Sequence, residues 1–177
     1  MAFFTYNDIK SIEEMIVTEG FNKEVIIDSA SDNFNGKSLF LAHSPMDEEY
    51  LVGAISFFFG FNCNPYVKKS TSNKNKSTYD VANDYKTIIK ACPKVVVLVS
   101  PESIDSQWIP WKLGYAEAIK GWDSVALLPI RDEYDVEEWI NDGYLGIYPR
   151  VVHQYGDWVV EDPRDKNHWK LYRWLTM

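Results

Sequence analysis

The chain has 177 residues, of which 46% are hydrophobic and 25% charged, so it can bury a real core and does not resemble a disordered chain. Its formal net charge of −8 argues against nucleic acid and anionic membranes as partners. Two cysteines, Cys63 and Cys92, are too few for a disulfide framework at this length, and we expect buried thiols rather than metal ligands. No stretch approaches the ~20 apolar residues of a membrane span and no signal peptide is visible, so a cytoplasmic protein is expected.

The two ends of the chain, residues 1–36 and 153–177, are expected to be extensions of a central domain. The run IKSIEEMIV has apolar residues at helical spacing, and the apolar run EVIIDSA at 24–30 predicts a short strand. Residues 165–177 predict an amphipathic closing helix. Apolar stripes of this size are too large to leave in water. We therefore expect both ends to dock on the central domain, with an assembly interface as the alternative.

Between these extensions, residues 37–152 alternate apolar runs with amphipathic segments, and KVVVLVS at 94–100 is the clearest strand. The expected strands lie at residues 38–43, 64–67, 94–100, 124–130 and 144–152. The expected helices lie at residues 44–61, 80–92, 108–121 and 132–142. Because parallel neighbours need crossovers of this length, the alternation predicts an α/β domain with a parallel sheet and helices on both faces.

The candidate site follows from this layout. In an open parallel sheet, ligands bind at the carboxyl ends of the strands, where the strand order reverses. This places His43, Ser44 and the segment 100–108 around one cleft with the lysine-rich loop at 68–78, which is either a solvated segment or a functional flap. The lysines of this loop, with Lys112, could attract a pyrophosphate or another anionic nucleotide. Scattered, solvated lysines are the simpler alternative.

Four stretches carry a family resemblance: LFLAHSPMDEEYL, CPKVVVLVSPESIDSQWIPWKLGYAEAIKG, SVALLPI and YLGIYPRV. Together they resemble a bacterial TIR (Toll/interleukin-1 receptor) domain over residues 37–152. The stretch SQWIPWKLGY, followed by ALLPI and YLGIYP at the right separations, is the specific part, whereas HS followed by Asp47 is weak alone. The resemblance implies a flavodoxin-like TIR fold with a five-stranded parallel sheet, in which the loop after the second strand bears function.

The resemblance also implies a chemistry, because many bacterial TIR domains cleave the nicotinamide–ribose bond of NAD+ and some cyclise the ADP-ribose product. That cleavage passes through a ribosyl cation, which a glutamate early in the third helix stabilises. In this sequence the glutamate position, directly after the Pro–Trp pair, is Lys112, and an acid often found after the second strand is replaced by Lys68 and Lys69. At about 4 Å and an effective dielectric of about 20, a unit-charge interaction is worth roughly 4 kcal/mol, so a sign change costs several powers of ten in rate.

Two functional hypotheses lead. The first is a TIR-domain protein of NAD-linked bacterial immune defence and signalling that binds a nucleotide or self-associates, with catalysis weakened by Lys112. The alternative is an active NAD+ glycohydrolase or cyclase that uses another carboxylate such as Glu102, with His43 either as a base or as a structural residue. A more distant flavodoxin-like enzyme, such as a nucleoside deoxyribosyltransferase, also needs a carboxylate nucleophile that we cannot place.

These hypotheses define the expected partners and site residues. NAD+ or a similar nucleotide is the expected substrate or ligand, and other TIR domains or a second copy of the chain are the expected protein partners. We expect no metal, no other cofactor, no nucleic acid and no membrane. The candidate catalytic residues are Lys112 and Glu102. The candidate nucleotide-binding residues are His43, Ser44, Lys68, Lys69, Ser100 and Trp108.

Overall fold

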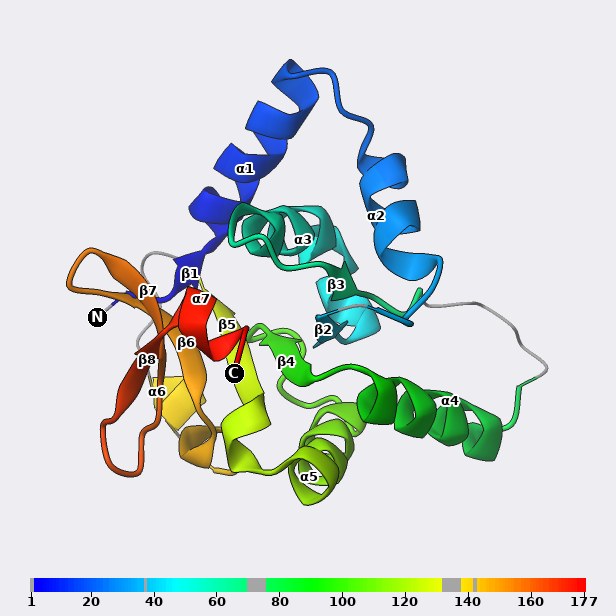
Figure 1. Cartoon of the computed structure of the whole chain (residues 1–177), viewed down its shortest axis with the longest axis vertical. Helices are drawn as coiled ribbons and strands as arrows, with labels where there is room; N and C mark the ends of the chain where they lie inside the picture. The colour runs from blue at the N-terminus through cyan, green and yellow to red at the C-terminus, as the bar shows by residue number, and fades with distance from the viewer. Residues whose placement is uncertain (1, 37, 70–75, 132–137, 142) are drawn as a thin grey trace.

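The computed structural model of the chain describes residues 2–36, 38–69, 76–131, 138–141 and 143–177. Its centre is one sheet flanked by helices (Figure 1). The structure has five parallel strands near the expected positions: β2 (Leu39–Ala42), β3 (Pro65–Tyr66), β4 (Lys94–Val99), β5 (Val125–Arg131) and β6 (Arg150–Gln154). Their order is β3-β2-β4-β5-β6, the order of a flavodoxin-like sheet with its switch point between β2 and β4. β2 and β4 are adjacent and parallel, with Leu39 opposite Lys94. The strand expected at 144–152 is wrong for its first part, because β6 begins only at Arg150 and residues 145–147 form a 3-10 turn.

The sheet continues beyond β6, which makes it mixed rather than purely parallel. Strand β7 (Asp157–Glu161) pairs antiparallel with β6, and β8 (His168–Lys170) pairs antiparallel with β7. Strand β1 (Phe4–Thr5) pairs in parallel with the end of β5. The closing helix expected over 165–177 is therefore wrong for its first half, since α7 covers Leu171–Trp174. Tyr155 and Gly156, with φ of 54° and 83°, form the two-residue turn that folds β7 back onto β6.

The helices pack on both faces of the sheet (Figure 1). They are α1 (Tyr6–Thr18), α2 (Lys23–Ser31), α3 (Leu51–Gly60), α4 (Thr78–Ala91), α5 (Trp108–Lys120) and α6 (Glu138–Asn141). Short 3-10 turns occur at η1 (Pro45–Tyr50), η2 (Trp122–Ser124) and η3 (Leu145–Ile147). Of the helix expected at 132–142, residues 138–141 are described and helical, and the remainder lies outside the described residues.

The strand expected at 24–30 is wrong, because these residues lie within α2. Asn22 begins this helix by accepting a hydrogen bond from the Glu24 amide at 2.8 Å, which satisfies one of the free N–H groups of the first turn. Ile27 and Ala30 then pack into the core beside α3. The short apolar run thus has one buried face, and periodicity over seven residues does not separate that pattern from a strand.

The sheet separates two apolar cores, and alternate residues of β2 enter opposite ones. Leu39 and Leu41 face the core that is built with α1, α2 and α3, whereas Phe40 and Ala42 face the core that is built with α4 and α5. His43 and Ser44, which follow β2, continue this alternation, so their side chains lie on opposite faces of the sheet.

Both terminal segments dock on the same sheet, so their apolar stripes are largely covered by the chain itself. Phe4 is 1% exposed and its ring lies 4.8 Å from Phe57 and 5.5 Å from Trp158. Ile9 is buried in the same core, and so is Trp174 from α7. The division into extensions at 1–36 and 153–177 around a domain at 37–152 stays a prediction.

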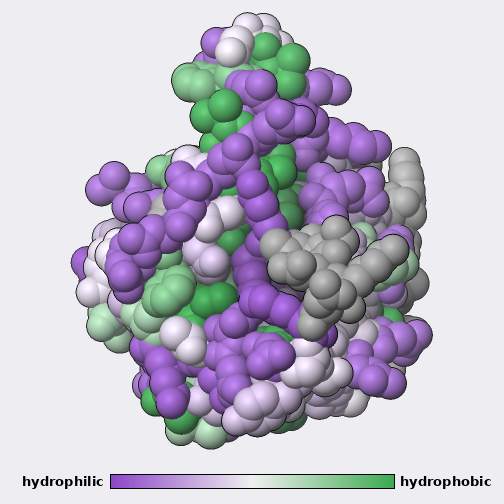
Figure 2. Space-filling model, turned by 90° about the vertical axis from the view of Figure 1, so that its right-hand side faces the viewer, coloured by the Kyte–Doolittle hydropathy of each residue, from purple (hydrophilic) through white to green (hydrophobic). Residues whose placement is uncertain are grey.

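The tip where α1 ends and α2 begins remains uncovered. Figure 2 shows hydrophobic surface there, above a side of the molecule that is mostly hydrophilic. The exposed apolar side chains of this tip are Met15, Val17, Phe21 and Val25. Among the described helices, none combines the length and apolar character needed to cross a membrane.

Candidate functional site

The end of β2 is fixed by a capped turn. Ser44 precedes η1, and its hydroxyl accepts a hydrogen bond from the Met46 amide at 3.3 Å. Asp47, three residues later, accepts from the Ser44 amide at 3.4 Å, which completes a capping box. Pro45 is the first residue of the turn, and its fixed φ suits that position. The local sequence HSPMD therefore favours the end of the strand at this point.

A buried polar network ties this turn to the end of β4. The Asp47 side chain is fully buried and accepts a hydrogen bond from the Ser100 hydroxyl at 2.6 Å. Burial raises the pKa of Asp47, and the hydroxyls of Ser100 and Ser103 partly oppose this rise. Ser100, which we expected to bind nucleotide, therefore joins β4 to η1 and does not line the cavity described next.

Lys112 is the central feature of the site. It lies in the first turns of α5, is 1% exposed, and lines the same cavity as Ser44, as its position in the sequence motif predicted. Its ammonium donates a hydrogen bond to the His43 carbonyl at 2.7 Å and lies 4.5 Å from the centre of the Tyr85 ring. Burial lowers the pKa of Lys112 to about 8, with the charge of Asp47 opposing and that of Lys68 adding to the shift.

The cavity beside Lys112 has a volume of about 220 Å³ and a cationic lining. It is lined by Ser44, Pro45, Lys68, Lys69, Lys76, Val81, Tyr85, Ser106, Trp108 and Lys112. None of these described lining residues is acidic. The carboxylates that pair with the lysines stand outside the lining: Asp84 binds Lys68 at 3.0 Å and Lys76 at 2.7 Å, and Asp28 pairs with Lys69. Two carboxylates thus pair directly with three of the four lysines, and Asp47 acts on the charge of Lys112 from outside the lining, so the lining itself is positively charged.

Of two other expected residues, Trp108 and Glu102, only the first lines this cavity. Trp108 lines it, with its ring 5.8 Å from that of Tyr85. Glu102 does not line it, and its carboxylate accepts a hydrogen bond from the Tyr6 hydroxyl at 3.0 Å. Partial burial raises the pKa of Glu102, but the hydrogen bonds that it receives outweigh this and leave the pKa below its usual range. Glu102 is therefore a solvent-exposed carboxylate held by α1, and the structure does not bring it together with Lys112 in one cavity.

The His43 imidazole belongs to a second cavity, on the other face of the sheet. His43 continues the alternation of Leu39 and Leu41, whereas Ser44 follows that of Phe40 and Ala42. This second cavity has a volume of about 300 Å³ and shares Lys69 with the first. Burial, together with the charge of Lys112, lowers the pKa of His43 to about 4.

Sequence reasoning missed two contributors to the site. They are Tyr85 and Asp47, neither of which is among the site residues expected from the sequence. The Ser-x-x-Asp spacing is a capping-box signal and could have identified the partner of Ser44. The ring of Tyr85 beneath the Lys112 ammonium depends on how α4 and α5 pack, which has no local signal.

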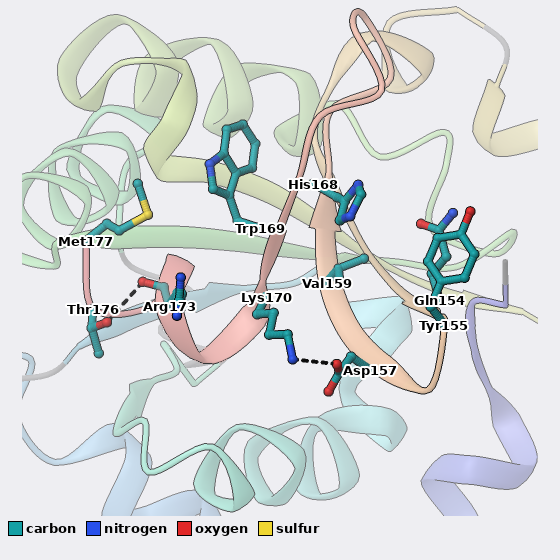
Figure 3. Close-up of a pocket in the computed structure, with 10 residues that line it drawn as sticks. All are labelled: Gln154, Tyr155, Asp157, Val159, His168, Trp169, Lys170, Arg173, Thr176 and Met177. Carbon is teal, nitrogen blue, oxygen red and sulfur yellow. Dashed lines mark hydrogen bonds and ion pairs between the residues drawn. The ribbon is translucent and has the colours of Figure 1, made fainter.

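A larger hollow lies away from the strand ends that position Lys112. It has a volume of about 700 Å³ and is formed by β7, β8 and α7 (Figure 3). Figure 3 shows its Lys170 ammonium paired with Asp157. The paired atoms lie 2.8 Å apart, and Arg173 from α7 also lines the hollow. Within the described part of the chain, no group of three or more His, Cys, Asp or Glu side chains is arranged to hold a metal ion.

Comparison with known proteins gives a relative of similar length but no family. No family model matches the chain. The chain is similar to a protein of Bacillus cereus (strain MSX-D12) named "Probable 3' cyclic ADP-D-ribose synthase ThsB'", with 29% identity over 165 residues. The match covers 86% of this chain and 84% of that protein. Its similarity thus extends over most of both chains, and the name of the relative refers to ADP-ribose chemistry.

Proposed function

We propose that this protein is a TIR-like nucleotide-binding protein of NAD-linked bacterial defence signalling, and that it binds an ADP-ribose-containing dinucleotide beside Lys112 while cleaving it slowly. The observation that carries the proposal is the lining of that cavity, which has four lysines and, among the described residues, no carboxylate. The pyrophosphate of NAD+ or ADP-ribose carries two negative charges, which match the excess positive charge there. Similarity to a 3' cyclic ADP-D-ribose synthase supports the choice of ligand.

The aromatic residues of the cavity suit the remainder of such a ligand. Trp108 and Tyr85 present ring surface on the same wall as the lysines. A nucleotide base can stack on a ring of this kind while the phosphates meet the ammonium groups. Lys68 lies 5.0 Å from the Tyr85 ring centre, so positive charge and ring surface are presented together.

The same lining explains why cleavage should be slow. Departure of nicotinamide leaves positive charge on the ribose, and a carboxylate near that carbon stabilises the transition state. In this cavity the group at the equivalent position is the Lys112 ammonium, which repels such charge. An interaction of roughly 4 kcal/mol that changes sign corresponds to several powers of ten in rate.

The test is incubation of the purified protein with NAD+, with nicotinamide, ADP-ribose and cyclic products resolved by chromatography. We expect slow turnover by the unmodified protein and a clear gain in Lys112→Glu. Lys112→Gln is the matched control, because it removes the charge without adding a carboxylate and should gain far less. Rapid nicotinamide release by the unmodified protein would overturn the proposal of weakened catalysis. If that release disappeared in Glu102→Gln, the alternative enzyme that uses Glu102 would be correct.

Binding is measured separately, by calorimetry with ADP-ribose. Losing one charged hydrogen bond to the pyrophosphate should weaken binding roughly tenfold or more. We therefore expect Lys68→Gln and Lys76→Gln to bind ADP-ribose more weakly, and Lys10→Gln, an exposed substitution on α1, to leave the affinity unchanged. Equal affinities in all three variants would show that the lysine-lined cavity is not the binding site.

A further inference from the structure

The cavity beside the His43 imidazole is separate from the lysine-lined cavity, and the proposed function does not use it. Pairs of consecutive residues are divided between the two: His43 and Ser44 at the end of β2, and Val67 and Lys68 just after β3. Because successive side chains of an extended strand point to opposite faces, one member of each pair reaches each cavity. The lining of the His43 cavity is Ile27, His43, Glu48, Leu51, Val67 and Lys69.

This cavity contains a buried polar atom that lacks a partner. His43 is 5% exposed, and its Nδ1 has no hydrogen-bond partner among the described residues. An unpaired polar atom in a buried place costs stability unless a ligand or water meets it. Burial and the charge of Lys112 lower the pKa of His43 to about 4, and a hydrogen bond to the Leu41 backbone only partly opposes this shift, so the imidazole is neutral at pH 7. It therefore offers one donor and one acceptor rather than a positive charge.

The walls and rim of the cavity define the kind of molecule that fits. Ile27 from α2, Leu51 from α3 and Val67 after β3 are apolar and come from three separate elements. At the rim, Glu48 is acidic and Lys69 is already paired with Asp28, so the rim offers no unpaired cation to an anionic ligand. A volume of about 300 Å³ is at the small end of ligand sites, and suits a single ring system better than a whole nucleotide.

We propose that the His43 cavity is a second ligand site, which takes a small, uncharged, planar heteroaromatic molecule carrying a hydrogen-bonding group, the class of nicotinamide and the free purine bases. The ring lies between Ile27, Leu51 and Val67, and its polar group meets His43 Nδ1. The site lies on the face of the sheet opposite to Lys112 and does not depend on dinucleotide binding there.

The first measurement is the binding of nicotinamide, with adenine as a second probe, by calorimetry and by the ¹⁵N chemical shifts of the His43 imidazole. We expect saturable binding of at least one probe and a change in the Nδ1 shift as it binds. His43→Leu keeps a buried apolar side chain but removes the nitrogen, and should weaken binding at least tenfold. His43→Asn places a polar atom close to the position of Nδ1 and should retain binding within a few-fold.

Two further variants locate the ligand. Ile27→Trp, at a half-buried wall position, fills the cavity while leaving His43 unchanged in sequence, and should abolish binding even if His43→Leu fails to fold. Lys68→Gln, on the opposite face, should leave the affinity for the probe unchanged. Loss of probe binding in Lys68→Gln with full binding in Ile27→Trp would place the ligand in the lysine-lined cavity and overturn the proposal. Failure of both probes to saturate also overturns it, whereas ADP-ribose binding, measured independently, tests the other site.

Discussion

The Lys112 ammonium donates a hydrogen bond to the backbone carbonyl of His43 at 2.7 Å, which joins the first turns of α5 to the end of β2. The other close partner is the face of the Tyr85 ring, at 4.5 Å from its centre. Both partners are uncharged, so they hold the ammonium in place without neutralising it. A lysine in a close ion pair has its charge matched by a carboxylate in contact, whereas Asp47 acts on the charge of Lys112 from a distance.

Replacing Lys112 by methionine should stabilise the protein at pH 7. Burial lowers the pKa of Lys112 from the ordinary value of 10.5 to about 8, so the folded protein holds this proton less tightly than the unfolded chain. The cost of burying the charge is fully present below pH 8 and is relieved as pH rises toward 10.5, because the unfolded chain then binds the extra proton. The shift corresponds to at most about 3 kcal/mol, from which the lost hydrogen bond and ring contact subtract.

The measurement is urea unfolding of the unmodified protein and of Lys112→Met at several pH values from 7 to 10. The difference in unfolding free energy should be largest at pH 7 and should shrink by pH 10. Lys86→Met on α4 is the control, because its ammonium lies near a ring, 5.9 Å from the centre of Tyr115, without the burial of Lys112. A difference that does not change with pH would show that Lys112 titrates normally in the folded protein.

The same substitution should raise the pKa of His43. Burial is the largest cause that lowers this pKa to about 4, and the charge of Lys112 is the next. Removing that charge leaves the effect of burial, so the pKa should move upward and stay below its ordinary value of 6.5. An NMR titration of the His43 ring protons in both proteins measures the change, with the exposed His168 as an internal reference. An unchanged pKa for His43 would mean that the two side chains are electrostatically independent.

The parallel core of the fold could be predicted because its strands carry strong local signals. The β-branched run from Lys94 to Val99 and the apolar run from Leu39 to Ala42 are each buried on both faces, and runs of that kind identify central parallel strands. The hairpin of β7 and β8 could not be predicted in the same way. Its turn at Tyr155 and Gly156 has a weaker signal than Asn-Gly, and Trp169 and Trp174 suggested a helical stripe.

The candidate site could be predicted only in part, because only some of its residues carry a local signal in the sequence. Motif position alone placed Lys112 and Ser44 in one cavity. The separation of His43 from Ser44 is present in the sequence as strand alternation, but the second cavity also needs Ile27 from α2, which was expected to be in a strand. Glu102 was placed at the correct end of the sheet, yet its contact with Tyr6 depends on the docking of α1 and has no local signal.

Asp47 should be more important for stability than an acid in the same motif on the surface. Asp47→Ala removes a buried acceptor and leaves the Ser100 hydroxyl without its partner, which should cost about 2–3 kcal/mol. Asp80 occupies the equivalent capping-box position on α4, where it accepts from Ser77 and is exposed. Asp80→Ala should therefore cost about 1 kcal/mol or less.

Both variants are compared by chemical denaturation under the same conditions. Because each substitution removes a capping acid, the difference between them isolates the buried link between η1 and β4. Equal losses would indicate that the link from Asp47 to Ser100 adds nothing beyond an ordinary helix cap.

The N-terminal segment should stabilise the protein through Phe4 and leave its oligomeric state unchanged. Phe4 is 1% exposed between the rings of Phe57 and Trp158, while β1 pairs with β5, so Phe4→Ala should open a cavity and cost about 3–5 kcal/mol. Phe21 is the matched control, because it is 60% exposed at the tip of α1 and α2 and its replacement by alanine should change stability little. Thermal unfolding measures both variants.

Light scattering measures the oligomeric state of the same proteins and of a chain lacking residues 1–35. It distinguishes an N-terminal segment that packs on its own chain from one that forms an interface between copies. If the N-terminal segment packs only on the core of its own chain, the truncated chain melts at a lower temperature and keeps the oligomeric state of the intact protein. A truncated chain of unchanged stability that loses self-association would show that α1 is an interface between copies. Loss of association in Phe21→Ala alone would locate that interface at the exposed tip, where the apolar side chains are already presented to solvent.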